Sequence, residues 1–147
     1  MTMTDQQQHC VVVGGSHAAA QFVANLRQRG FAGRITLVSE EALLPYQRPP
    51  LSKGFLGGTL SEAELLIRPE EFYREQRIET RLGERVTRID RAAHKIQLQS
   101  GGELEYTKLV LATGARVRKL QVPGADLNGV YYLRSFSDVQ AIRDHAK

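Results

Sequence analysis

A glycine-rich turn near the start of the chain carries the first residues whose types and spacing suit chemistry. It reads Gly14-Gly15-Ser16-His17-Ala18-Ala19 and approximates the pattern G-x-G-x-x-G/A, in which backbone N–H groups at a helix N-terminus hold a pyrophosphate. Gly14 permits the tight turn, and Ala19 is small enough to let helix and strand pack closely. Ser16 replaces the second glycine. Because serine is small, we expect this change to weaken pyrophosphate binding modestly rather than to abolish the site.

An acidic residue follows the turn at the spacing that the pattern expects. Glu40 comes about 20 residues after Ala19, where a carboxylate accepts hydrogen bonds from ribose hydroxyls. The alternative is a glycine-rich turn in an ordinary α/β protein, and the six-residue motif alone does not separate the two. The flanking strands and helix, together with Glu40, favour a nucleotide.

The elements that must position these residues form a strand–helix–strand unit. Cys10–Val13 is a short apolar run, which is typical of a strand buried on both faces of a parallel sheet. Residues 18–29 are mostly good helix formers with an apolar stripe at helical spacing. Ile35–Val38 reads as the second strand, with Glu40 beyond its carboxyl end. Parallel strands require such a crossover.

The rest of the chain predicts further strands and an inserted meander. Ile78–Thr80 and Leu109–Ala112 should join the parallel sheet. The alternating residues between 84 and 106 predict a three-stranded antiparallel meander over one face. We also expect short helices over residues 51–56, 61–66 and 68–75, a strand at residues 130–133, and a last helix over residues 136–145 capped by Ser135. The fold class is therefore α/β, a Rossmann-like parallel sheet with an inserted antiparallel β-meander.

Composition excludes several classes of protein. Of 147 residues, 24% are charged and 41% hydrophobic, which is typical of a soluble globular protein, and no apolar run could span a membrane. The net charge of +4 comes from scattered basic residues, which argues against nucleic acid. A single cysteine, Cys10, excludes a redox dithiol. The four histidines are dispersed, so we expect no metal site. We expect a cytoplasmic protein in which residues 1–9 are a disordered leader.

Four segments together make the sequence similar to a known family. They are VVVGGSHAAAQFVANLR, LLPYQRPPLSKGFL, LVLATGARVRKL and VYYLRSFSDVQAI. Together they resemble the flavoprotein ferredoxin reductases of bacterial oxygenase systems, of the putidaredoxin-reductase and rubredoxin-reductase type. The PYQRPPLSK block is the most specific part. The resemblance covers the first segment of the family's FAD domain, so we expect residues 10–147 to be a partial FAD-binding domain, without the NAD domain and the later FAD segments.

The resemblance also implies roles for individual residues. Glu40 would bind the adenosine ribose and Val86 would contact adenine through its main chain. Lys53 would be the catalytic lysine beside the flavin, where a cation stabilises negative charge on the reduced ring. Arg48 would neutralise phosphate charge, and Arg134 would approach the flavin or the phosphates. The remaining cofactor contacts implied are Gly14, Ser16, His17, Ala18 and Ala19 around the pyrophosphate, and Ala112, Thr113 and Gly114 against the nucleotide.

The function implied is an NAD(P)H-dependent flavoprotein ferredoxin reductase. Electrons would pass from NAD(P)H through FAD to a ferredoxin- or rubredoxin-type iron–sulfur protein. Two other functions stay open at this point: an NAD-binding Rossmann domain without flavin, and a non-catalytic module that binds a nucleotide or a partner. We expect these 147 residues on their own to be inactive and to hold FAD poorly or not at all.

Overall fold

The computed structural model describes residues 7–146. In chain order the elements are β1 (His9–Val13), α1 (His17–Gln28), β2 (Arg34–Ser39), the 3-10 helix η2 (Pro49–Ser52), α2 (Glu62–Leu65), α3 (Glu70–Glu75), β3 (Ile78–Leu82), β4 (Val86–Asp90), β5 (Lys95–Leu98), β6 (Glu103–Glu105), β7 (Lys108–Leu111) and α4 (Phe136–His145). They fall into two compact units: residues 7–46 with 66–114, and residues 47–65 with 115–146.

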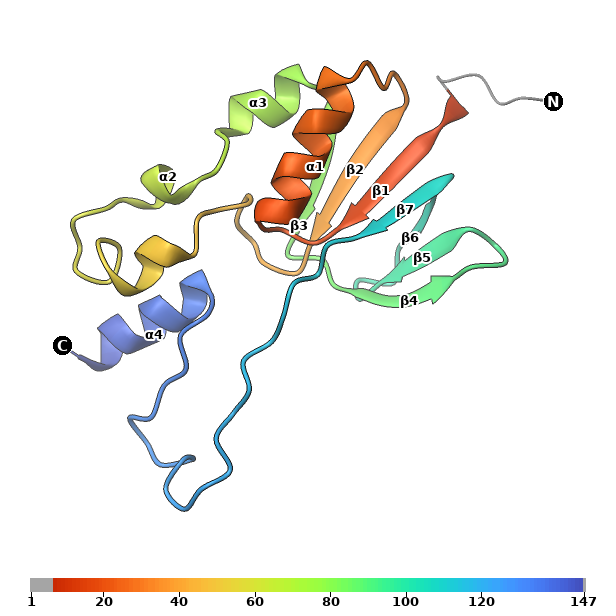
Figure 1. The fold of residues 1–147 in the computed structure, drawn as a ribbon. Helices are drawn as coiled ribbons and strands as arrows, with labels where there is room; N and C mark the ends of the chain where they lie inside the picture. Colours follow the sequence, from red (N-terminus) through yellow and green to blue (C-terminus); the bar gives the residue numbers. More distant parts are fainter. Residues whose placement is uncertain (1–6, 147) are drawn as a thin grey trace. The chain divides into compact units, whose positions relative to one another are not determined.

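The first unit is built on a four-stranded parallel sheet of order β3-β2-β1-β7 (Figure 1). The strands β1 and β2 are joined by α1, which is the predicted crossover. A separate antiparallel sheet, β4-β5-β6, contains the predicted meander. The parallel sheet and the meander confirm the predicted fold class.

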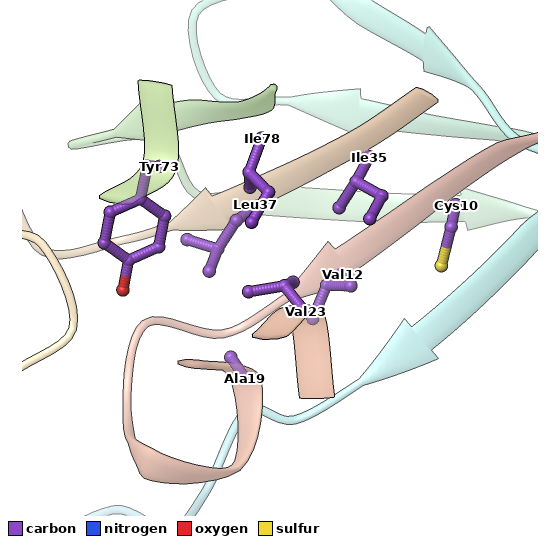
Figure 2. Packing of buried hydrophobic residues seen from close by; sticks show 8 residues of the cluster. All are labelled: Cys10, Val12, Ala19, Val23, Ile35, Leu37, Tyr73 and Ile78. Atoms are coloured by element: carbon purple, nitrogen blue, oxygen red, sulfur yellow. The ribbon is translucent and has the colours of Figure 1, made fainter. Parts of the chain in front are cut away.

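Each face of the parallel sheet has its own apolar layer. On one face Val12 and Leu37 pack with Val23 of α1 and Tyr73 of α3 (Figure 2). On the other face the meander covers the sheet through a second cluster, made of Val11, Val13, Val38, Ile96, Leu98 and Leu104. Because successive strand residues point to opposite faces, the all-apolar run in β1 is explained by burial on both sides.

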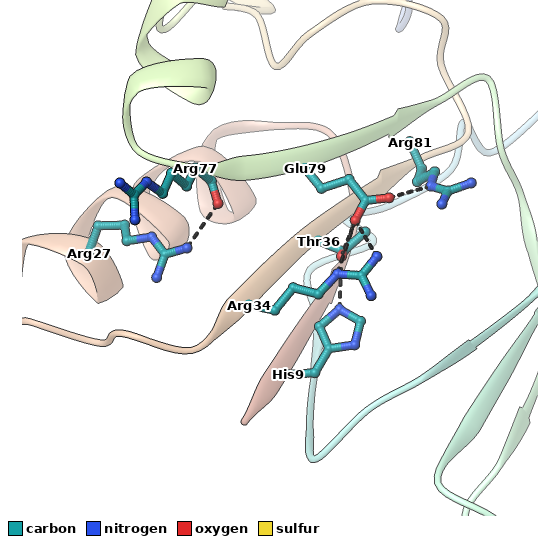
Figure 3. A network of polar contacts seen from close by, with 7 residues as sticks. All are labelled: His9, Arg27, Arg34, Thr36, Arg77, Glu79 and Arg81. Atoms are coloured by element: carbon teal, nitrogen blue, oxygen red, sulfur yellow. Dashed lines mark hydrogen bonds and ion pairs between the residues drawn. The ribbon is translucent and has the colours of Figure 1, made fainter. Parts of the chain in front are cut away.

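The end of α1 is fixed by one arginine. The Arg27 guanidinium donates to the carbonyl oxygens of Phe31 at 2.6 Å and Gly33 at 2.7 Å, in the turn that leads to β2. It also reaches the carbonyl oxygen of Gln76 at 2.8 Å. It donates as well to the carbonyl oxygen of Arg77 at 2.9 Å (Figure 3), and both residues lie in the turn from α3 to β3. One side chain thus joins the two turns at the amino ends of neighbouring strands.

A polar network joins side chains of β1, β2 and β3 (Figure 3). His9 Nε2 lies 2.8 Å from Oγ1 of the buried Thr36, which donates to Glu79. Glu79 also pairs with Arg34 and, at 2.7 Å, with Arg81. Burial alone would raise the pKa of Glu79, but the two arginines lower it. Burial, followed by the Arg34 charge, lowers the pKa of His9.

The N-terminal boundary is a correction to the sequence-based expectation. His9 belongs to β1, and the carbonyl of Gln8 accepts from the N–H of Arg34 at 2.8 Å. The disordered leader expected over residues 1–9 therefore cannot extend to His9, because the backbone beside Arg34 is paired. Residues 1–6 of that leader lie outside the described residues.

The second unit holds η2, α2 and α4. Ser135 caps α4 in a capping box with Asp138, which confirms that helix. Phe55 and Phe136 stack with their ring centroids 5.0 Å apart. Arg143 lies over the Phe55 ring at 4.5 Å and donates to the Phe55 carbonyl.

Two predicted elements of this unit are wrong. The helix expected over residues 51–56 is instead η2, which begins at Pro49 and ends at Ser52, because proline sets its first turn. The strand expected at residues 130–133 is irregular backbone. Its apolar side chains lie exposed, with Val130 at 44% and Leu133 at 37%, and a strand needs a pairing neighbour to satisfy its backbone.

Candidate functional site

The glycine-rich turn lies at the carboxyl ends of the parallel strands. Gly14 has a φ of +136° and donates its N–H to the Val38 carbonyl at 2.8 Å. A β-carbon on Gly14 would lie 2.1 Å from the Ala112 carbonyl oxygen, and one on Gly15 would lie 2.0 Å from Ser39 Oγ. The turn is therefore enclosed by the ends of β2 and β7 and has no room for side chains at either glycine.

The first turn of α1 is suited to an anion. Its N-cap, Ser16, is extended at φ −134° and ψ −165°, and its side chain makes no capping hydrogen bond. The first helical bond joins the N–H of Ala20 to the Ser16 carbonyl at 3.0 Å. The N–H groups of residues 17–19 therefore have no partner within the helix. No acidic residue lies in this turn, and His17 and Ala18 are exposed. These donors and the helix dipole fit a pyrophosphate.

Glu40 follows β2 at the same edge of the sheet. Its carboxylate is 62% exposed and pairs with Arg85, whose Nη1 lies 3.2 Å from Glu40 Oε1. Arg85 directly precedes Val86, the first residue of β4, so the structure brings Glu40 close to the segment that was expected to contact adenine. Sequence reasoning missed Arg85, because a charged residue between two strands gives no signal of its partner.

The residues after β7 complete this edge of the first unit. The N–H of Ala112 donates to the Val13 carbonyl at 2.8 Å, which places it beside the glycine-rich turn. Thr113 and Gly114 follow it and are exposed, with Gly114 at a φ of +68°. Thus the first unit holds the predicted contacts Gly14, Ser16, His17, Ala18, Ala19, Glu40, Val86, Ala112, Thr113 and Gly114.

The other three predicted site residues belong to the second unit. Arg48 donates from Nη1 to the Arg134 carbonyl at 2.7 Å, so these two residues lie together. Lys53 is exposed and is the C-cap of η2, with its N–H bonded to the Pro50 carbonyl at 3.0 Å. The roles of all three as cofactor contacts stay predictions.

Three other features of residues 7–146 bear on the chemistry of the chain. No three side chains among the histidines, cysteines, aspartates and glutamates of this range gather as metal ligands. Cys10 is buried in β1, and burial raises the pKa of its thiol. Over the same range, no helix has both the length and the apolar character that crossing a membrane requires.

Comparison with known proteins adds a family to this geometry. The sequence profile described as "Pyridine nucleotide-disulphide oxidoreductase" matches residues 8–147. Rhodocoxin reductase of Rhodococcus erythropolis is 43% identical over 132 residues, which is 90% of this chain and 31% of that protein. Rubredoxin-NAD(+) reductase of Pseudomonas putida is 41% identical over 133 residues, which is 90% of this chain and 34% of that protein.

Solved structures agree with the sequence comparison. The ferredoxin reductase for the CYP199A2 system of Rhodopseudomonas palustris has a TM-score of 0.87 at 43% identity, over 95% of this chain and 34% of that one. The reductase of the covalent putidaredoxin reductase–putidaredoxin complex has a TM-score of 0.84 at 34% identity, over 95% of this chain and 34% of that one. The chain thus spans about one third of the length of these relatives, and it belongs to the pyridine nucleotide-disulphide oxidoreductase family.

Proposed function

We propose that this chain forms the first part of an FAD site in an NAD(P)H-dependent ferredoxin or rubredoxin reductase. The observation that carries the proposal is the uncapped first turn of α1, which leaves backbone donors for a pyrophosphate at the carboxyl end of β1. The curated relatives are named as reductases that act with rhodocoxin or rubredoxin, which supports the reaction class and an iron–sulfur partner.

The residues of the first unit would bind the ADP half of the cofactor. The N–H groups around Gly14 and at the start of α1 donate to phosphate oxygens, and Glu40 accepts from the ribose hydroxyls. Glu40 is 62% exposed, so its carboxylate is accessible to a ligand. Val86 contacts the adenine through its main chain, and Thr113 and Gly114 line the approach.

The residues of the second unit would serve the flavin half. Bound there, FAD would supply a hydride acceptor for NAD(P)H and a donor of single electrons to the acceptor protein. Lys53 would supply a cation to the flavin ring, and Arg48 would offset phosphate charge. The hydrogen bond from Arg48 to the Arg134 carbonyl orders the Arg48 side chain, which lowers the entropy that a ligand contact must overcome.

A titration with three ligands tests this function. The purified protein is titrated with FAD by flavin fluorescence, and with NAD and ADP by calorimetry. We expect ADP to saturate the protein, FAD to bind only weakly, and NAD to bind more weakly than FAD because NAD has no isoalloxazine ring for Lys53 and its loop to contact. Saturable NAD binding without FAD binding would instead indicate a Rossmann domain without flavin.

An activity measurement completes the test. NAD(P)H-driven reduction of a ferredoxin or rubredoxin by the protein that carries this chain would support the reductase. Nucleotide binding without any such reduction, in a preparation with stoichiometric FAD, would indicate a non-catalytic module.

A further inference from the structure

Two segments meet at the carboxyl edge of the sheet, and Glu40 belongs to one of them. Ser39 and Glu41, on either side of it, accept backbone hydrogen bonds from Glu84 at 2.8 Å and Gly83 at 3.0 Å. Residues 39–41 and 83–85 therefore run side by side. The Glu40 and Arg85 side chains meet across these two segments at 3.2 Å.

The neighbouring acid has a different, structural partner. The hydroxyl of Tyr46, which is 1% exposed, donates to Glu41 Oε2 at 2.5 Å. The N–H of Glu41 donates to Ser39 Oγ at 3.2 Å. These contacts fix the chain directly after Glu40 and explain why Glu41 is only half-exposed, whereas the Glu40 carboxylate is left at the surface.

Within residues 7–146, the hydrogen bonds and ion pairs of the Glu40 side chain come from Arg85, and they involve Oε1. The second carboxylate oxygen, Oε2, has no such contact in that range. The pair is exposed, with Arg85 at 44%, so it adds little to the stability of the fold. Its geometry matters more, because Arg85 Nη1 engages Oε1 alone.

We propose that Arg85 is a positioning residue for nucleotide binding: it holds Glu40 through Oε1 and presents Oε2 to the ribose hydroxyls. This inference rests on the proposed function, since it concerns the same ribose site. A carboxylate has about four lone-pair positions, so the bond from Arg85 leaves acceptors for both hydroxyls. Ordering Glu40 before the ligand arrives reduces the entropy lost on binding.

The test compares ADP with 2′-deoxy-ADP on a set of variants. We expect the purified wild-type protein to bind ADP about tenfold more tightly than 2′-deoxy-ADP, because Glu40 accepts a charge-assisted hydrogen bond from the 2′-hydroxyl of ADP. Arg85→Gln is expected to weaken ADP binding about three- to tenfold and to leave 2′-deoxy-ADP less affected, so that discrimination between the two ligands falls. Arg85→Lys should discriminate between the two ligands better than Arg85→Gln does, but less well than the wild type.

Two controls separate positioning from general damage. Arg81→Gln removes an arginine of matched exposure, 45%, which pairs with Glu79 in the network of Figure 3, and should change neither affinity. In a Glu40→Gln background, Arg85→Gln should add little further loss, because coupled residues are not additive.

Each outcome has a defined meaning. Unchanged discrimination in Arg85→Gln, or tighter ADP binding because Arg85 competes with the ribose, would overturn this inference and leave the proposed function in place. Failure of the wild-type protein to bind either ADP or FAD would overturn the proposed function and this inference with it.

Discussion

A β-carbon placed on Gly14 would lie 2.1 Å from the carbonyl oxygen of Ala112. The turn after β1 and the residue after β7 are therefore in direct backbone contact, and the φ of +136° at Gly14 is one that L residues rarely adopt. This contact holds two ends of parallel strands beside the first turn of α1. It links the fold of the first unit to the candidate pyrophosphate site.

Gly14→Ala should therefore destabilise the protein by at least about 2 kcal/mol, from backbone strain together with the clash. Chemical denaturation measures this loss. Gly30→Ala is the matched control, because Gly30 also has a positive φ, +85°, but a β-carbon added there would meet nothing within 4 Å. Gly30→Ala should lower the free energy of unfolding by about 1 kcal/mol. Equal losses at the two positions would show that the contact with Ala112 is unimportant.

The capping box of α4 predicts a dependence on pH. Burial alone would raise the pKa of Asp138, but hydrogen bonds from Ser135 and Arg134 lower it below its ordinary value of 3.8. A carboxylate with a lowered pKa stabilises the folded state above its ordinary pKa, and that contribution disappears as the pH falls through the folded value. Amide hydrogen exchange in α4 should therefore accelerate as the pH drops below 3.8, beyond the intrinsic change in exchange rate.

Asp138→Ala should remove this pH dependence and weaken α4 by about 1 kcal/mol at neutral pH, as the loss of a cap does. Gln140→Ala, at an exposed position of the same helix, is the control and should keep the pH response. If Asp138→Ala left exchange in α4 unchanged, the capping box would have no energetic role.

Replacing Lys53 should change the rate of flavin reduction without releasing FAD. If its cation lies beside the flavin, Lys53→Ala should slow the reduction of bound FAD by NAD(P)H about 10- to 100-fold, while FAD stays bound. Stopped-flow absorbance of the protein that carries this chain measures the rate. Lys53→Arg keeps the charge and should retain more of the rate than Lys53→Ala. An unchanged rate in Lys53→Ala would make Lys53 a surface lysine.

The sequence predicted the parallel sheet well because its strands have unusual composition. The run at Val11–Val13 is apolar on every residue, which only burial on both faces explains, and both faces of β1 are indeed covered. Residues 130–133 are also mostly apolar, yet they form no strand. Local composition cannot report whether a pairing strand is present, and pairing decides the outcome.

The candidate site was predictable where a local motif defines it. The Gly14–Ala19 turn and Glu40 were found because their spacing along the chain is fixed by the strand–helix–strand unit. Arg85 was missed because it meets Glu40 from 45 positions away, through the pairing of two segments after different strands. Such contacts depend on tertiary structure and leave no periodic pattern in the sequence.

Ala18→Asp tests most directly whether the first turn of α1 binds a pyrophosphate. Ala18 is exposed in a turn that has no acid. An aspartate there should stabilise the helix slightly, by about 0.3–1 kcal/mol, because it interacts favourably with the helix dipole. The same charge should repel a phosphate. Ala18→Asn, which is similar in shape and uncharged, is the control.

Calorimetric titration with ADP gives the decisive result. We predict that Ala18→Asp weakens ADP binding at least about tenfold, equal to about 1.4 kcal/mol, while its thermal midpoint stays equal to the wild-type value or rises. Ala18→Asn should bind nearly as well as the wild type. Undiminished ADP affinity in a folded Ala18→Asp protein would contradict pyrophosphate binding at this turn, because a pyrophosphate held there must encounter that charge.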